Sequence, residues 1–91
     1  MEQTKYVIEY DIEMEGKLKK LSKPVRKMIL NAIEKKLTAD PIAFGKPLRY
    51  SLKGHRRLRI GDYRVIYRIE EERVIVFIID VGHRKDIYDD D

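Results

Sequence analysis

Apolar positions in the first half of the chain recur at helical spacing. After a β-branched and aromatic run at residues 6–10, Met14, Leu18 and Leu21 follow at i, i+4 and i+7, which is one face of a helix. A longer apolar stripe occupies residues 25–37, and Pro24 suits its first turn because the N–H that proline lacks is not needed there. Proline also disfavours helical geometry in the residue before it, so the Asp40-Pro41 pair is expected to end this helix. The pattern therefore predicts one strand followed by two helices.

Residues 42–47 are expected to form a loop, marked by Gly45 and Pro47. From Leu48 onward the period changes to two, as is typical of strands. Arg57 and Arg59 alternate with Leu58 and Ile60, which places the arginines on one face and the aliphatic side chains on the other. Gly61 and Asp62 then predict a tight turn between this strand and the next.

Two further strands complete the pattern. Residues 63–69 form one of them, with Arg64 and Arg68 sharing a face. Residues 74–79 are a continuous apolar run, as expected of a central strand covered on both sides, and Gly82 is expected to interrupt it. The order β-α-α-β-β-β predicts a single α+β domain over residues 1–91. In this domain a helical hairpin packs on a mainly antiparallel four-stranded sheet, with a short turn at the C-terminus.

The charge is unevenly distributed and changes this picture. The net charge is only +4, but seven Lys and Arg side chains lie between Arg49 and Arg68 with Asp62 as the one acidic residue. Four arginines on adjacent strands repel one another, and a planar guanidinium fork matches phosphate. The pattern favours a polyanion ligand. The competing interpretation is cross-strand pairing with Glu9, Glu70 or Glu72 on the outer face of the sheet.

Composition excludes several classes of chemistry. The chain has no cysteine, so disulfides and thiolate sites are excluded, and its two histidines do not have metal-ligand spacing. We therefore expect neither a metal nor a cofactor. No apolar run approaches the ~20 residues that span a bilayer, and the N-terminus lacks a signal-peptide pattern. The expectation is a cytoplasmic protein that does not contact membranes.

Three segments, in this order, resemble the RelE/ParE toxin superfamily. They are residues 52–54 (LKG), 57–67 (RLRIGDYRVIY) and 81–88 (VGHRKDIY). The resemblance extends to the initial strand and to the helical pair that ends in Asp-Pro. Its RelE-like branch cleaves messenger RNA, mostly in the ribosomal A site, whereas its ParE-like branch poisons DNA gyrase without a nuclease site. A basic residue after the last strand and a tyrosine near the C-terminus resemble the nuclease members, so the resemblance implies a metal-independent endoribonuclease.

The resemblance also implies roles for individual residues. Arg64 and Arg84 would hold the scissile phosphate, and Tyr88 would stack on a base or orient the 2′-OH. Arg57 and Arg59 stand where other members often carry lysines, one of which is proposed as the general base. This departure puts the identity of the base in doubt, because a guanidinium stays protonated at neutral pH. His83 is then the best candidate for acid or base, since histidine ordinarily exchanges protons near neutral pH. The expected RNA-contacting set is completed by Arg57, Arg59, Arg68 and Lys53.

Expected partners follow from the same resemblance. They are messenger RNA, the ribosome and an acidic antitoxin that covers the basic face and displaces the C-terminal tail. Two other functions stay open at this point. One is a ParE-like inhibitor of DNA gyrase, and the other is an RNA-binding module whose catalytic capacity has decayed.

Overall fold

The computed structural model describes residues 5–87, and the elements follow the expected order with short additions. The regular elements are β1 (Val7–Tyr10), α1 (Met14–Lys19), α2 (Lys23–Ala32), α3 (Pro41–Phe44), β2 (Lys46–Pro47), β3 (Arg56–Ile60), β4 (Tyr63–Glu70) and β5 (Ile75–His83). A π-helical turn, η1 (Ile33–Leu37), extends α2, and two 3₁₀ turns lie at η2 (Tyr50–Leu52) and η3 (Glu71–Arg73).

The strands form one sheet in the order β1-β5-β4-β3-β2. β1 runs parallel to β5, and every other pair is antiparallel. The α+β fold with a helical pair on a mainly antiparallel sheet is confirmed, with one strand more than the predicted four. The additional strand β2 is the Lys46–Pro47 pair beside Arg56 and Arg57. Two residues are too few to show an alternating pattern in the sequence.

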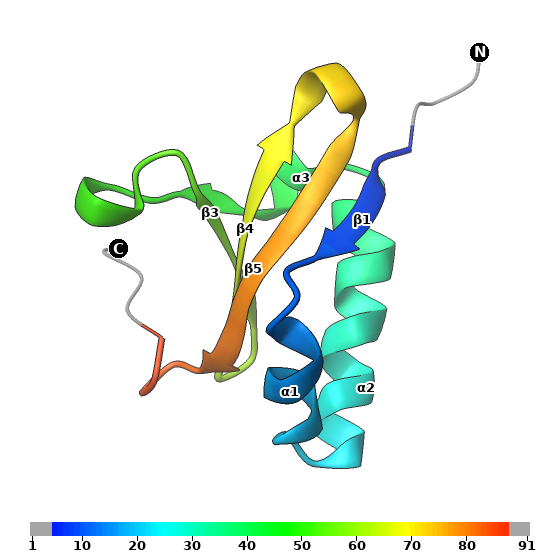
Figure 1. The fold of residues 1–91 in the computed structure, drawn as a ribbon, viewed down its shortest axis with the longest axis vertical. Coiled ribbons are helices and arrows are strands. Elements are labelled where there is room, and N and C mark those ends of the chain that lie inside the picture. The colour runs from blue at the N-terminus through cyan, green and yellow to red at the C-terminus, as the bar shows by residue number, and fades with distance from the viewer. Residues whose placement is uncertain (1–4, 88–91) are drawn as a thin grey trace.

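Helices α1 and α2 cover one face of this sheet (Figure 1). The N-cap of α2 is Ser22, whose side chain accepts a hydrogen bond from the N–H of Val25 at 3.4 Å, and proline occupies the first turn as predicted. The predicted apolar stripe reaches the core except at Met28, which is 42% exposed. The core combines the two helices with the inner face of the sheet through Met14, Ile29, Ile33, Leu37, Leu58, Val65, Tyr67, Val76 and Ile78.

Two predicted boundaries are wrong. Residues 42–47 were expected to form a loop, but Pro41 opens α3, whose N-cap Asp40 accepts a hydrogen bond from the N–H of Ala43 at 3.0 Å. Proline stops a preceding helix and also suits the first turn of the next one. Gly82 was expected to end the last strand, but β5 continues to His83 because Gly82 stays paired with Arg64. Ile87 packs closely over Gly82, and a Cβ added to this glycine would lie 3.1 Å from the Ile87 side chain.

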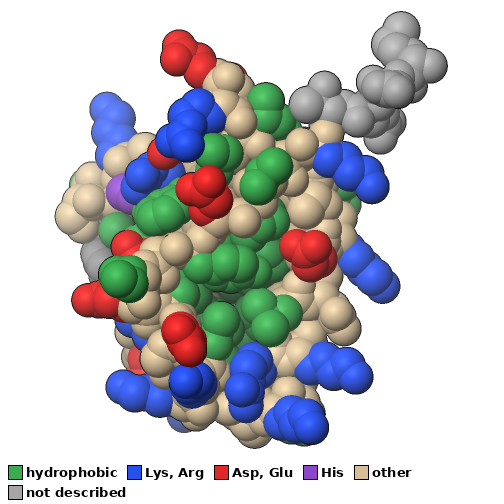
Figure 2. Space-filling model, turned by 45° about the vertical axis from the view of Figure 1, so that its right-hand side comes forward, with side chains coloured by type: hydrophobic (Ala, Val, Ile, Leu, Met, Phe, Trp, Pro, Cys, Tyr) green, Lys and Arg blue, Asp and Glu red, His purple; other side chains and the backbone are tan. Residues whose placement is uncertain are grey.

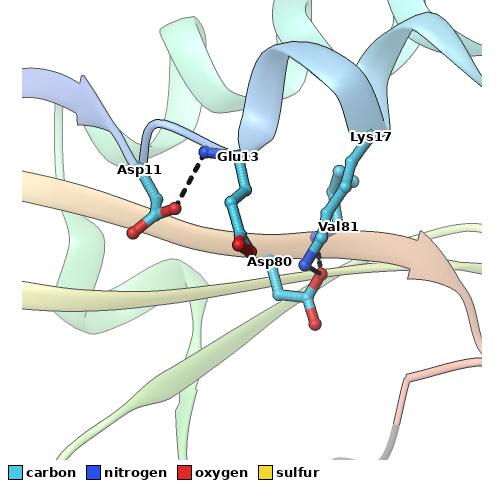
Figure 3. A network of polar contacts seen from close by, with 5 residues as sticks. All are labelled: Asp11, Glu13, Lys17, Asp80 and Val81. Carbon is cyan, nitrogen blue, oxygen red and sulfur yellow. Dashed lines mark hydrogen bonds and ion pairs between the residues drawn. The ribbon is translucent and has the colours of Figure 1, made fainter.

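One ion pair fastens α1 to β5 where β1 has ended (Figure 3). Lys17 Nζ lies 2.6 Å from Asp80 Oδ1, and the same oxygen accepts a hydrogen bond from the N–H of Val81 at 2.9 Å. The adjoining part of β5 is irregular, because the β4–β5 register shifts between Ile66 and Tyr67. The extra residue in β5 turns Asp80 toward α1, since a bulge re-aims the side chains beside it.

The face formed by β1, α1 and α2 carries an exposed apolar groove. Figure 2 shows hydrophobic side chains gathered at its centre, with Lys and Arg side chains at one end. The groove encloses about 440 Å³ between Tyr10, Ile12, Leu18 and Leu30, and Ile12 is 94% exposed. Burial, followed by the charge of Glu34, raises the pKa of Tyr10 above its ordinary value. The adjoining hollow shares Leu30 and is lined by Lys23, Arg26 and Lys27. Within residues 5–87, the helices are too short or too polar to cross a membrane.

Candidate nucleic-acid interface

The β3–β4 hairpin places two arginines directly opposite each other on the sheet face that points away from the helices. Arg59 pairs in register with Arg64 across a two-residue turn, where Gly61 has a φ of +59°. Register partners in an antiparallel pair have Cβ atoms about 5 Å apart, and like charges in that position destabilise the sheet. Arg59 is exposed and Arg64 half-buried, so both can meet a ligand from solvent. An anion between them would offset their repulsion.

The turn itself brings a third arginine to this end of the sheet. Arg64 donates from Nη1 to the carbonyl oxygens of Gly61 and Tyr63, each at 3.1 Å. Arg84 donates its backbone N–H to the carbonyl oxygen of Asp62 at 2.7 Å, and its Nε lies 3.8 Å from the Asp62 carboxylate. Both partners of that ion pair are more than half exposed, so it contributes little stability and can exchange for a phosphate. We call Arg59, Arg64 and Arg84 the turn cluster.

The structure places His83 on a different face from the turn cluster. His83 is the register partner of Tyr63, and their rings meet edge-on with centroids 5.4 Å apart. Gly82, one residue earlier, is the residue beside Arg64. The imidazole lines a hollow with Lys17, Lys20 and Asp80 on the helix side of the sheet.

His83 also organises the turn that follows β5. Its Nδ1 accepts a hydrogen bond from the N–H of Lys85 at 3.1 Å, and its carbonyl oxygen accepts from Asp86 and Ile87. A neutral imidazole that accepts at Nδ1 carries its proton on Nε2. The ring therefore has a structural role whether or not it transfers protons.

Arg57 lies on the expected face but is buried. Its side chain is 2% exposed, and its register partner Ile66 is 4% exposed. Alternation along β3 determines the face to which a side chain points. It does not determine whether other residues cover that side chain. Burial therefore separates Arg57 from the exposed Arg59 on the same strand, and its expected contact with RNA stays a prediction.

Arg68 pairs with one of the glutamates named in the competing interpretation, but the pair lies along β4 and not across two strands. Its Nη2 lies 3.2 Å from the Glu70 carboxylate, and its guanidinium lies 4.6 Å from the centroid of the Phe77 ring. It shares a face with Arg64 but sits four residues further along β4, about 13 Å away. Arg68 is thus bound to neighbours of its own, apart from the turn cluster.

Lys53 and Tyr88 remain from the predicted set. Lys53 is exposed in the segment between β2 and β3, and Tyr88 lies outside the described residues. Within residues 5–87, no three or more His, Asp or Glu side chains gather in a way that could hold a metal ion. Sequence reasoning missed Asp62 as the anchor of Arg84. Its place in the tight turn was visible, but its contact with a residue 22 positions later was not.

The chain resembles known toxins over most of its length. The family model described as the ParE toxin of the type II toxin–antitoxin system parDE matches residues 8–88. The mRNA interferase toxin RelE of Escherichia coli is 30% identical over 84 residues, covering 88% of this chain and 84% of that protein. The toxin RelG of Mycobacterium tuberculosis is 48% identical over 52 residues, a match that spans 57% of this chain and 60% of the relative.

The fold is shared with solved toxin structures. The toxin–antitoxin complex RelBE of Mycobacterium tuberculosis contains a chain with a TM-score of 0.85 and 32% identity, covering 93% of this chain and 98% of that chain. The isolated Escherichia coli RelE toxin has a TM-score of 0.70 at 24% identity, covering 86% and 83% of the two chains, which compares the fold alone. The family match over nearly all of the sequence and the shared fold agree, and the chain belongs to the RelE/ParE superfamily of type II toxin–antitoxin toxins as a RelE-like member.

Proposed function

We propose that this chain is an endoribonuclease toxin that cleaves messenger RNA in the ribosomal A site. The turn cluster is the observation that carries the proposal. Arg59 faces Arg64 directly, and Arg84 is anchored to the turn between their strands. Three permanently charged guanidiniums at one sheet end suit a phosphate diester. The name of the Escherichia coli relative, an mRNA interferase, supports the choice of substrate.

The reaction follows from the chemistry of RNA. The ribose 2′-oxygen forms a bond to phosphorus while the bond from phosphorus to the 5′-oxygen breaks, which leaves a 2′,3′-cyclic phosphate and a 5′-hydroxyl. Negative charge gathers on the phosphorane in between, where preorganised cations stabilise the transition state more than the ground state. We assign this stabilisation to Arg64 and Arg84, and contact with a neighbouring phosphate to Arg59. The ribosome would supply the alignment of the 2′-OH with the leaving group.

Cleavage also requires two proton transfers. One proton must leave the 2′-OH, and another must reach the 5′-oxygen. His83 is the candidate for one of these transfers, and its ring points to the side of Tyr63 in the free protein. Because the ring nitrogen and the carbonyl oxygen of His83 are bonded only within the short 83–87 segment, we propose that His83 reorients when RNA binds, while Arg84 stays anchored to Asp62. Tyr88 remains the candidate for stacking or for orienting the 2′-OH.

The testing experiment is primer extension on a defined messenger translated in a cell-free system. Wild type is compared with Arg64→Ala and Arg84→Ala. We expect breaks within codons that require ribosomes and fall by at least about 100-fold in both variants, the usual cost of losing a preorganised transition-state contact. An intact messenger with wild-type protein would refute the nuclease function.

A second assay on the same preparation separates the alternatives. The matching family model is described by the name ParE, so a DNA supercoiling assay with gyrase is run on the same preparation. Loss of supercoiling with an intact messenger would indicate a gyrase inhibitor. RNA binding with neither effect would indicate a binding module without activity.

We also propose a cognate antitoxin as the protein partner. Solved relatives include RelE toxins in complex with RelB antitoxins. On this chain the apolar groove beside Ile12 continues into the cationic hollow at Lys23, Arg26 and Lys27. This combination fits a helical segment with an apolar stripe and acidic residues at one end. A second segment of the antitoxin would cover the basic sheet face and displace the C-terminal tail.

A further inference from the structure

The segment between β2 and β3 presents an aromatic ring to solvent. Tyr50 is 78% exposed and has a φ of +56°. Figure 1 shows this segment, in green, projecting from the β3 side of the sheet and far from α1 and α2. Folding accounts for neither property. An exposed ring buries little apolar area, and a left-handed backbone favours Gly, Asn or Asp over a bulky residue.

Hydrogen bonds hold this segment in one conformation. The N–H of Leu48 donates to the carbonyl oxygen of His55 at 3.0 Å and closes the segment at its base. The N–H of Lys53 donates to the carbonyl oxygen of Tyr50 itself, also at 3.0 Å. The ring is therefore carried on a fixed turn, and a binding group held in place loses less entropy when its ligand arrives.

The surroundings of Tyr50 are cationic. The exposed side chains of Lys46, Arg49 and Lys53 lie close to it in the sequence. No acidic residue occurs between Asp40 and Asp62. An exposed ring among cations fits a ligand that offers both negative charge and a flat π-face, and single-stranded nucleic acid offers both. An acidic peptide would offer the charge without the π-face.

The position of Tyr50 also fits an RNA held at the turn cluster. β3, the five residues Arg56–Ile60, runs from the Tyr50 segment to the Gly61 turn. β3 itself spans about 15 Å, and the Tyr50 segment and the turn cluster lie at its opposite ends. A single strand fixed at its scissile phosphate would reach Tyr50 a few nucleotides away.

We propose that Tyr50 is a stacking platform for an unpaired RNA base flanking the cleaved phosphate. The choice of RNA rests on the proposed function, whereas the platform itself rests on the exposure, backbone conformation and charge of this segment. The strained backbone is the cost of presenting the ring, so binding and stability oppose each other at this residue.

The test uses four proteins and a short 2′-O-methyl RNA, which cannot be cleaved. They are wild type, Tyr50→Phe, Tyr50→Gly and Val74→Gly. Val74 is the matched control, because among residues 5–87 it is the other non-glycine residue with positive φ, at +55°, and it lies in the β4–β5 turn beside acidic residues. The dissociation constant is measured by fluorescence anisotropy at fixed salt, and Tm by thermal unfolding.

We expect Tyr50→Gly to bind RNA about 10-fold more weakly, the loss typical of one base–aromatic stack. We expect its Tm to rise by about 4 °C, because glycine relieves the left-handed strain. Val74→Gly should raise Tm in the same way without weakening binding, and Tyr50→Phe should bind within about twofold of wild type, since phenylalanine keeps the π-face.

Several outcomes would overturn the inference. Unchanged binding by Tyr50→Gly would exclude a base contact, and so would undetectable binding by wild type. Loss of antitoxin capture with intact RNA binding would assign Tyr50 to the protein partner instead.

Cleavage assays on the same variants separate the two proposals. Weaker binding in a protein that never cleaves RNA supports the platform while the nuclease proposal fails. Normal cleavage and binding by Tyr50→Gly would leave the nuclease and remove the platform.

Discussion

At the scale of single residues, Tyr67 connects the α3 segment to the sheet. Its ring is fully buried, and its hydroxyl donates to the carbonyl oxygen of Pro41 at 2.6 Å. Arg56, its register partner on β3, donates from Nη2 to the carbonyl oxygens of Ile42 and Gly45 at 2.8 and 3.0 Å. These bonds satisfy backbone groups of α3 and fix where the chain enters β2. The start of β3, and with it the Tyr50 segment, depends on this contact.

Gly45→Ala is expected to be strongly destabilising. A Cβ at this position would lie 1.8 Å from the Tyr67 hydroxyl oxygen and 3.0 Å from the carbonyl oxygen of Arg57. The buried ring must move and lose its bond to Pro41, so we expect the free energy of unfolding to fall by about 3 kcal/mol. Urea denaturation measures it. Gly16→Ala is the control, because open space surrounds its added Cβ, and equal stability of the two variants would contradict the prediction.

Tyr67→Phe tests the same contact through its pH dependence. Burial raises the pKa of Tyr67 above its ordinary value, although the neighbouring Arg56 lowers it in part. The folded chain therefore keeps this proton at a pH where the unfolded chain has begun to lose it, near about pH 10. The contribution to stability is present below that pH and is lost as the pH rises toward the folded pKa.

The expected result for Tyr67→Phe has two parts. The free energy of unfolding at pH 7 should fall by about 1 kcal/mol, because the carbonyl oxygen of Pro41 loses its donor. Its decline above about pH 10 should be shallower than that of wild type, because one raised tyrosine pKa is gone. Denaturation at a series of pH values checks both. Parallel curves for the two proteins would show that Tyr67 does not contribute to the alkaline loss.

At the scale of elements, β4 carries two arginines on one face with different surroundings. Arg64 bends toward the Gly61 turn, whereas Arg68 lies over Phe77 and pairs with Glu70. The period of two could be read from the sequence, and the face of each arginine follows from it. The sequence could not show that Arg64 faces a ligand while Arg68 is structural. Phe77 comes from the next strand, and the turn contacts of Arg64 depend on the hairpin.

Arg64→Ala and Arg68→Ala are therefore a matched pair on one strand. Arg64→Ala should lose ribosome-dependent cleavage by at least about 100-fold. Arg68→Ala should keep cleavage within about threefold and lose about 1 kcal/mol of stability, from its contacts with Phe77 and Glu70. Primer extension and urea denaturation on both variants give the comparison. Equal loss of cleavage would place Arg68 in the RNA site and refute the division drawn between them.

At the scale of the whole molecule, the apolar groove and the turn cluster belong to different parts of the structure. The groove lies between β1, α1 and α2, whereas Arg59 and Arg64 of the turn cluster lie on the sheet face away from the helices and Arg84 follows the end of β5. Ile12 in the groove is 94% exposed, which is unusual for an isoleucine in a folded domain. A partner held in this groove gains affinity without contacting the residues assigned to cleavage.

Ile12→Glu separates partner binding from cleavage. A carboxylate in an apolar groove opposes the seating of an acidic helical segment, so capture of the co-expressed antitoxin should weaken by at least about 10-fold. Cleavage by the free toxin should be unchanged, and so should its stability, because the side chain is exposed. Binding is measured by titration of the purified antitoxin. Full affinity with Ile12→Glu would place the antitoxin contact elsewhere, with the basic sheet face as the next candidate.

Much of this protein is determined by local sequence. Periods of 3.6 and two positioned the helices and the long strands, and the turn at Gly61 placed Arg59 opposite Arg64. The short elements α3 and β2 escaped prediction because four and two residues carry no readable period. The continuation of β5 through Gly82 also escaped it, because strand pairing overrides the weak propensity of one glycine.

The sequence by itself determined the fold class, the superfamily and the face on which each arginine lies, since these depend on residues close together in the chain. The tertiary structure decided what each arginine can do. It buried Arg57, placed Arg68 over Phe77 and brought Arg84 back to Asp62. It also turned His83 toward Tyr63 and left Ile12 exposed. The physical reason is that direction along a strand is a local property, whereas burial and pairing depend on neighbours that only the folded chain brings together.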